Sequence, residues 1–134
     1  MNIYDESFTN SDIYKEFLEQ NPSRGNLRIR AFAAREAIPI SGMKITVSKN
    51  IDDVDIVFFE GYTDESGIIE RISLPAPKLD ENNLDVPKLI TYDVLATYPE
   101  EGFNQIYKVI MYENVCVIQN IIVNYNFNIE KSIS

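Results

Sequence analysis

The side chains that could do chemistry in this sequence are one thiol and several clustered carboxylates, because histidine is absent from all 134 residues. Without imidazole, Ser-His-Asp and Cys-His nucleophiles and the zinc sites that depend on histidine are excluded. Cys116 lies among apolar residues in Val115-Cys116-Val117-Ile118, a setting that disfavours the reactive thiolate. We therefore expect a structural thiol and no catalytic residue.

The carboxylates are densest at Asp52, Asp53 and Asp55, with Asp64 and Glu65 further along the chain. A glycosidase would need two such groups held across a sugar cleft, whereas aspartates in turns commonly cap local backbone N–H groups. Carboxylates are also ligands of Ca²⁺, so Asp52, Asp53 and Asp55 form a candidate calcium site that lacks the alternating arrangement of an EF-hand. The simpler interpretation is a pair of hydrated turns, with no cofactor.

The negative net charge of the chain excludes some classes of binding partner. The net charge of −9 repels phosphate backbones and anionic lipids, so we expect neither nucleic acid nor a membrane as a partner. Half of the twelve basic residues nevertheless fall in one stretch, namely Arg24, Arg28, Arg30, Arg35, Lys44 and Lys49. Pairing with carboxylates on adjacent strands is the simpler interpretation, and a polyanion-binding face is the alternative.

These residues must be positioned by short segments in which apolar and polar residues alternate. Residues 11–20 carry one apolar stripe and predict a short helix that ends before Pro22. Beyond it the period is two, and the expected strands cover 27–33, 43–48, 56–63, 68–74, 90–98, 105–112 and 115–125. Seven strands separated by turn signals and by no helix predict an all-β sandwich.

The length indicates one domain. We expect a lead-in over 1–23, the β-sandwich over 24–126 and a loose tail over 127–134. No apolar run approaches the roughly 20 residues that span a bilayer, and the first residues do not resemble a signal peptide. The expected location is therefore the cytoplasm, or the spore or cell wall if the chain arrives there without a signal peptide.

Several turn motifs carry a family resemblance. They are Gly25-x-Leu27-x-Ile29, Ala37-Ile38-Pro39-Ile40-x-Gly42-Met43-x-Ile45-x-Val47, Thr63-Asp64-x-x-Gly67 and Leu74-Pro75-x-Pro77. The sequence resembles the carboxypeptidase regulatory-like domains, which are transthyretin-like or prealbumin-like, and within them the small stand-alone or cortex-lytic-enzyme-associated forms of spore-forming Gram-positive bacteria. The resemblance implies an Ig-like or prealbumin-like Greek-key β-sandwich that is not catalytic.

The sequence thus predicts a structural or interaction module that binds a protein or a cell-wall polymer through a sheet face or a loop end. Arg28, Arg30, Phe32, Tyr98 and Phe103 form the candidate surface, because arginine and outward-facing aromatic rings can anchor an interface or stack on sugars. One alternative is a domain that binds cell-wall or cortex glycan. Another is a subunit of a homomeric assembly, joined through an exposed edge strand.

Overall fold

The computed structural model describes residues 12–33, 38–79 and 89–123. It begins with α2 (Asp12–Gln20), whose buried side chain is Phe17. The helix ends at Gln20, and the next residue, Asn21, donates from both its backbone N–H and its side-chain amide to the carbonyl oxygen of Phe17. Within the described residues, no helix combines the length and the apolar character that a membrane crossing requires.

The remaining elements are strands, together with the short 3₁₀ helix η1 (Pro99–Glu101). The strands are β1 (Ser23–Ala33), β2 (Ile38–Pro39), β3 (Lys44–Ile51), β4 (Val54–Tyr62), β5 (Ile68–Ala76), β6 (Ile90–Tyr98), β7 (Phe103–Met111) and β8 (Cys116–Val123). The expected all-β sandwich with a short N-terminal helix is confirmed. The described residues form eight strands instead of seven, because β2 adds a two-residue pairing to the end of β1.

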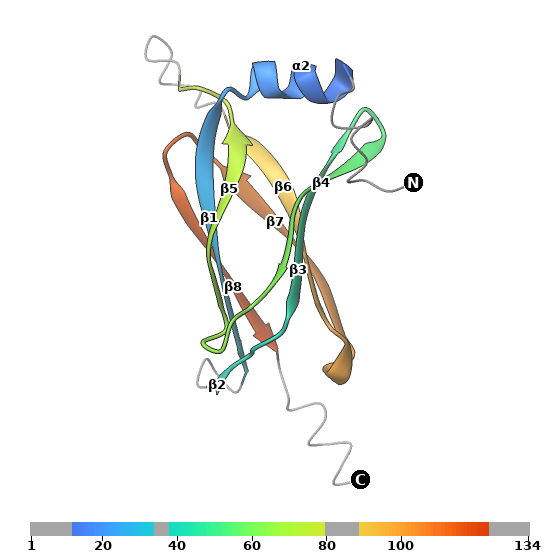
Figure 1. Cartoon of the computed structure of the whole chain (residues 1–134), viewed down its shortest axis with the longest axis vertical. Helices are drawn as coiled ribbons and strands as arrows, with labels where there is room; N and C mark the ends of the chain where they lie inside the picture. The colour runs from blue at the N-terminus through green and yellow to red at the C-terminus, as the bar shows by residue number, and fades with distance from the viewer. Residues whose placement is uncertain (1–11, 34–37, 80–88, 124–134) are drawn as a thin grey trace, which may run out of the picture.

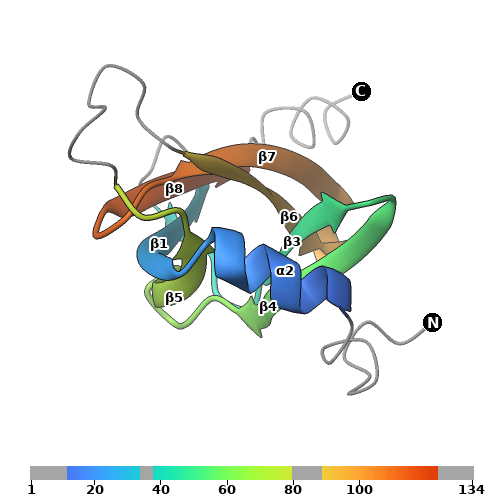
Figure 2. The same ribbon diagram turned by 90° about the horizontal axis from the view of Figure 1, so that it is seen from above.

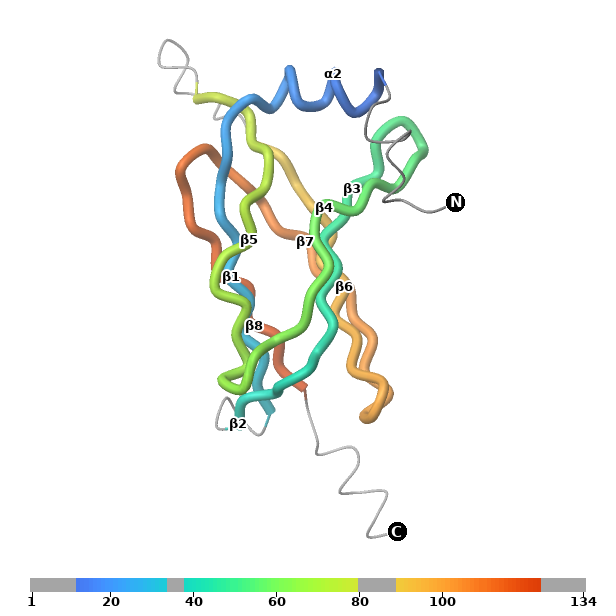
Figure 3. The backbone as a smooth tube through the Cα atoms, viewed as in Figure 1, coloured from blue at the N-terminus to red at the C-terminus, as the bar shows by residue number. Residues whose placement is uncertain are grey.

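The strands form two sheets (Figure 1). In the first, here called the β1 sheet, β1 pairs antiparallel with β5 and β2 and parallel with β8. In the second, the β3 sheet, the order is β4-β3-β6-β7 and every pairing is antiparallel. The last described strand therefore lies beside the first, and the tube in Figure 3 shows β2 at the end of the sandwich opposite α2.

The core lies between the sheets and follows the alternation seen in the sequence. On β1, four alternate residues are fully buried, and these are Leu27, Ile29, Ala31 and Ala33. On β6, Tyr92, Val94 and Ala96 face the same core. Since successive side chains of a strand point to opposite faces, the residues between them lie on the outer face of each sheet.

The helix closes one end of the sandwich (Figure 2). Phe17 reaches the ring of Phe58 on β4, with 5.5 Å between the ring centroids. Phe58 in turn meets the edge of Tyr92 on β6 at 5.3 Å. This row of rings joins α2 to the centre of the core. Because the helix lies at the end of the sandwich, it does not cover the outer face of either sheet.

Candidate interaction surface

The basic residues that are close in the sequence are divided between the two sheets. Arg24, Arg28 and Arg30 lie on β1, whereas Lys44 and Lys49 lie on β3. Arg35, the sixth member of this group, is outside the described residues. The chain therefore does not present one continuous positive patch, because the segment between β1 and β3 carries it from one sheet to the other.

Most of these cations have partners nearby. The Arg28 guanidinium lies 3.6 Å from Glu70, and the Lys44 ammonium lies 3.4 Å from Glu60. Arg24 donates to the hydroxyl and the carbonyl oxygen of Ser73. Such exposed ion pairs contribute about 0 to 1 kcal/mol each, so they orient side chains more than they stabilise the fold.

Lys49 is more enclosed than the other basic residues. Its ammonium donates to the carbonyl oxygen of Thr91 at 2.9 Å, which links β3 to β6. Burial lowers the pKa of Lys49, while nearby Asp93 acts in the opposite direction. This cation is therefore committed to the fold and is a poor candidate for binding a polyanion.

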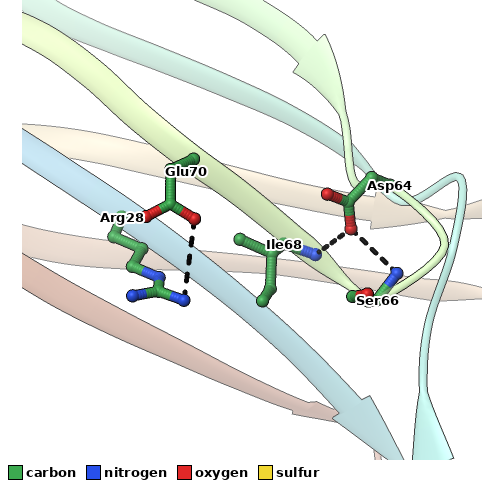
Figure 4. A network of polar contacts seen from close by, with 5 residues as sticks. All are labelled: Arg28, Asp64, Ser66, Ile68 and Glu70. Atoms are coloured by element: carbon green, nitrogen blue, oxygen red, sulfur yellow. Dashed lines mark hydrogen bonds and ion pairs between the residues drawn. The ribbon is translucent and has the colours of Figure 1, made fainter.

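Three of the expected surface residues do share one face. Arg28, Arg30 and Phe32 lie on the outer face of β1, and the Arg30 guanidinium stacks over the Phe32 ring at 4.9 Å from its centroid. Figure 4 shows Arg28 reaching across to Glu70 on β5. These contacts hold a flat arginine and an aromatic ring at fixed positions on the sheet.

Strand β8 adds apolar side chains to this face. In the parallel pairing, Ile118 lies beside Arg28 and Ile122 lies beside Phe32. The two isoleucines are 52% and 46% exposed. We call this set the β1–β8 face, and it consists of Arg28, Arg30, Phe32, Ile118 and Ile122.

Sequence reasoning missed the two isoleucines of this face. The segment from Val115 onward is apolar at odd and even positions alike, so its pattern does not say which side chains point outward. A signal was present in the uncharged run from Cys116 to Val123, which is unusual for a strand at the edge of a sheet.

The other two expected surface residues lie elsewhere. Tyr98 and Phe103 are paired across the β6–β7 hairpin in the β3 sheet. Tyr98 continues the buried row of Tyr92 on β6, and Phe103 faces the same core from β7. Both rings are partly buried there, so the expected outward orientation is not what the structure shows. The structure therefore does not bring Tyr98 and Phe103 together with the β1–β8 face.

Most of the clustered acids occupy turns, as expected, but Asp55 lies in β4, opposite Asn50 of β3. Asp52 and Asp53 form the β3–β4 turn with φ angles of 51° and 65°, and Asp55 accepts a hydrogen bond from the side chain of Asn50. Asp64 caps its own turn by accepting from the N–H groups of Ser66 and Ile68 (Figure 4). In the described ranges, no group of three or more His, Cys, Asp or Glu residues could hold a metal ion, so the calcium candidate gains no support.

Two further features could form a site, namely the thiol of Cys116 and a hollow beneath α2. Cys116 is exposed, which differs from the expected apolar setting, because among the described strands β8 pairs with β1 alone and the thiol lies on its outer face. The hollow has a volume of about 140 Å³ and is lined by Ile13, Glu16, Phe17, Gln20, Ile51 and Asp52. Pockets for small-molecule ligands usually measure about 300 to 1,000 Å³, so this hollow is too small for one.

The fold and the surface together define the class, an all-β two-sheet sandwich whose candidate site is a sheet face. No family model matches the sequence, and no curated protein matches it. Among solved structures, a shaft pilin from Lactobacillus rhamnosus GG is similar at 18% identity and a TM-score of 0.52. The match covers 76% of this chain and 49% of the pilin chain.

A second solved structure, transthyretin from Sparus aurata, is similar at 16% identity and a TM-score of 0.42, over 72% of this chain and 90% of that one. The chain spans about half the length of the pilin. At such identities the likeness to the pilin establishes the fold alone. The β-sandwich prediction is therefore confirmed by a solved structure as well as by the strand order.

Proposed function

We propose that this chain is a non-catalytic structural or interaction module that binds a protein partner through the β1–β8 face. The observation that carries the proposal is the combination on that face of two half-exposed isoleucines with an arginine stacked on an aromatic ring. Protein interfaces are enriched in aromatic residues and arginine, and the centre of an interface is depleted of other charged residues. The β1–β8 face matches this composition.

The positions of the aspartates and glutamates support a non-catalytic role. Asp64 is engaged in capping a turn, and Asp55 accepts from Asn50, so these carboxylates already have structural roles. A hydrolytic mechanism would need two carboxylates converging on a cleft. The hollow beneath α2 has one aspartate and one glutamate in its lining, but it is smaller than a sugar-binding cleft.

The unit that we propose for this role is the sandwich itself, residues 24–126, with 1–23 as a lead-in and 127–134 as a tail. The carboxypeptidase regulatory-like relationship, the link to spore-forming bacteria and a cytoplasmic or spore-associated location stay predictions. Binding of cell-wall glycan also stays a prediction. It is less favoured, because Tyr98 and Phe103 are partly buried against the core.

The test uses a charge reversal on the face and a matched reversal away from it. Arg30→Glu removes the stacked cation, while Lys15→Glu makes the same change of charge on the exposed side of α2. Each tagged protein is incubated with lysate of the source cell, and the retained proteins are quantified by mass spectrometry. We expect partners of the unmodified chain to be lost with Arg30→Glu and kept with Lys15→Glu.

Equal retention by both variants would contradict the assignment of binding to the β1–β8 face. Circular dichroism of each variant checks that the sandwich is folded, so that loss of binding is not loss of structure. Release of reducing sugars from isolated cell wall by the unmodified chain would contradict the non-catalytic assignment itself.

A further inference from the structure

The edge strands of the two sheets differ in how well they are protected against pairing with another chain. Natural edge strands carry charges, prolines or bulges that prevent such pairing. On the β1 sheet, β5 contains Pro75 and a register shift opposite Leu27 and Ile29. On the β3 sheet, β4 has a register shift opposite Val47 and Ser48, and β7 carries Lys108.

Strand β8 has none of these devices. Its eight residues include no charge and no proline, and its pairing with β1 runs from Cys116 to Val123 without a register shift. Within the described part of the chain, β8 pairs with β1 alone, and no described strand covers the other side of its backbone. On that side the carbonyl oxygen of Asn120 accepts from the exposed side-chain amide of Gln119, a contact that a second strand would replace. A regular, uncharged and open strand is a template for another strand.

We propose that β8 pairs antiparallel with β8 of a second copy of this chain, about a two-fold axis that passes through Asn120. The pairing joins two β1 sheets into one continuous sheet. This inference rests on the proposed interaction role and specifies its partner as the same chain.

The register follows from which side chains face outward. Residues directly opposite each other in an antiparallel pair share a face of the sheet, and the even-numbered residues of β8 are the outer ones. With the axis at Asn120, Ile118 lies opposite the partner subunit's Ile122, and Ile122 lies opposite the partner subunit's Ile118. Both exposed isoleucines thereby gain an apolar neighbour, as a self-complementary two-fold interface requires.

The distribution of charge favours this edge over the others. A net charge of −9 repels a second copy wherever acids would meet, but β8 is neutral and its neighbour β1 presents Arg28 and Arg30. In the proposed sheet the two copies of Arg30 are three strand spacings apart, about 14 Å, which exceeds the screening length of about 8 Å. Pairing through β7 would instead place Lys108 at the interface.

The register is tested by disulfide formation across the axis in a Cys116→Ser background, since Cys116 is exposed and is the chain's one cysteine. Asn120→Cys places two thiols on residues directly opposite each other, where Cα atoms about 4.5 to 5.5 Å apart fit a disulfide. Ile118→Cys is the matched control, because its two copies are offset by four residues, about 13 Å.

After mild oxidation we expect a covalent dimer of the Asn120→Cys protein, while the Ile118→Cys protein stays monomeric on a non-reducing gel. Equal cross-linking of the two variants, or no cross-linking of Asn120→Cys, would overturn the proposed register.

Self-association is measured separately by sedimentation velocity. We expect a dimer for the unmodified chain, loss of the dimer with Ile122→Lys, and no loss with Ile110→Lys, which alters an isoleucine on β7 of nearly the same exposure, 44% against 46%. A monomer at all concentrations would contradict the inference. It would leave the proposed function standing if Arg30→Glu still abolished partner retention, because Arg30 lies one strand away from the paired edge.

Discussion

The phenolic hydroxyl of Tyr92 on β6 donates a hydrogen bond of 2.5 Å to the carbonyl oxygen of Pro75 on β5. This contact ties the β3 sheet to the β1 sheet through the core, where Tyr92 is almost fully buried. Burial raises the pKa of Tyr92 far above its usual range. The hydroxyl therefore keeps its proton and remains a donor at neutral pH.

Replacement of Tyr92 by phenylalanine should remove the donor while preserving the ring that packs on Phe58. The buried carbonyl oxygen of Pro75 would lose its partner, which costs about 1 to 3 kcal/mol. The free energy of unfolding, measured by urea titration, is expected to fall by this amount. Tyr62→Phe is the control and should leave it unchanged, because Tyr62 is 63% exposed.

A second buried hydroxyl holds the turn between β2 and β3. Thr63 donates to the carbonyl oxygen of Ile40 at 2.6 Å and accepts from the N–H of Met43 at 3.0 Å. Thr63→Val keeps the shape but leaves both backbone groups without this partner, so we expect a loss of about 2 to 3 kcal/mol in urea titration. Thr63→Ser retains the hydroxyl and should lose less, and an undiminished free energy of unfolding in Thr63→Val would show that these two hydrogen bonds do not stabilise the turn.

Two glycines with similar backbone angles should respond differently to a methyl group. Gly42 and Gly67 have φ angles of 79° and 75°, a region that costs other residues about 1 to 2 kcal/mol. A Cβ at Gly42 meets nothing within 4 Å, whereas at Gly67 it lies 2.4 Å from the carbonyl oxygen of Ala31. The clash adds about 1 to 3 kcal/mol to the backbone strain.

We therefore expect Gly67→Ala to lower the unfolding free energy by about 2 to 5 kcal/mol and Gly42→Ala by about 1 to 2 kcal/mol. The two variants are compared by thermal unfolding and urea titration under the same conditions. Similar losses at both positions would mean that backbone strain alone accounts for the effect and that the contact with Ala31 is relaxed at no cost.

Much of the fold could be predicted from the sequence because burial follows chain-local alternation. In β1 the residues from Leu27 to Ala33 alternate so regularly that the strand and its buried face are readable without a structure. The alternation also contains the position of Tyr98, which falls in the same row as Tyr92. The prediction that the Tyr98 ring points outward did not take this row into account.

The candidate surface could be predicted only in part, because alternation says which side chains share a face and not which strands meet. Arg30 and Phe32 are on one strand, so their shared face is readable from their spacing. Ile118 and Ile122 join them through the parallel pairing of β8 with β1, a contact between the two ends of the described chain. No local pattern encodes that pairing.

The turn between β7 and β8 should be sensitive to acid. The Glu113 carboxylate accepts a hydrogen bond from the Leu79 N–H at 2.5 Å and another from the Ser23 hydroxyl at 2.9 Å. The Leu79 N–H contributes most to lowering the pKa of Glu113, followed by the Ser23 hydroxyl. Both donors favour the charged form, so the folded state binds its proton less readily than the unfolded chain does.

Because the folded pKa of Glu113 lies below the unfolded one, its contribution to stability is complete above the unfolded value of about 4.3 and is lost as the pH falls through the folded value. Glu113→Gln removes the charge at every pH. We expect unmodified protein to exceed this variant in unfolding free energy at pH 7, and the difference to shrink at pH 3, as measured by urea titration.

Glu65→Gln, in the exposed β4–β5 turn, controls for the general loss of a negative charge. A difference between the unmodified protein and Glu113→Gln that is the same at both pH values would show that the carboxylate does not need its charge to hold Leu79 and Ser23.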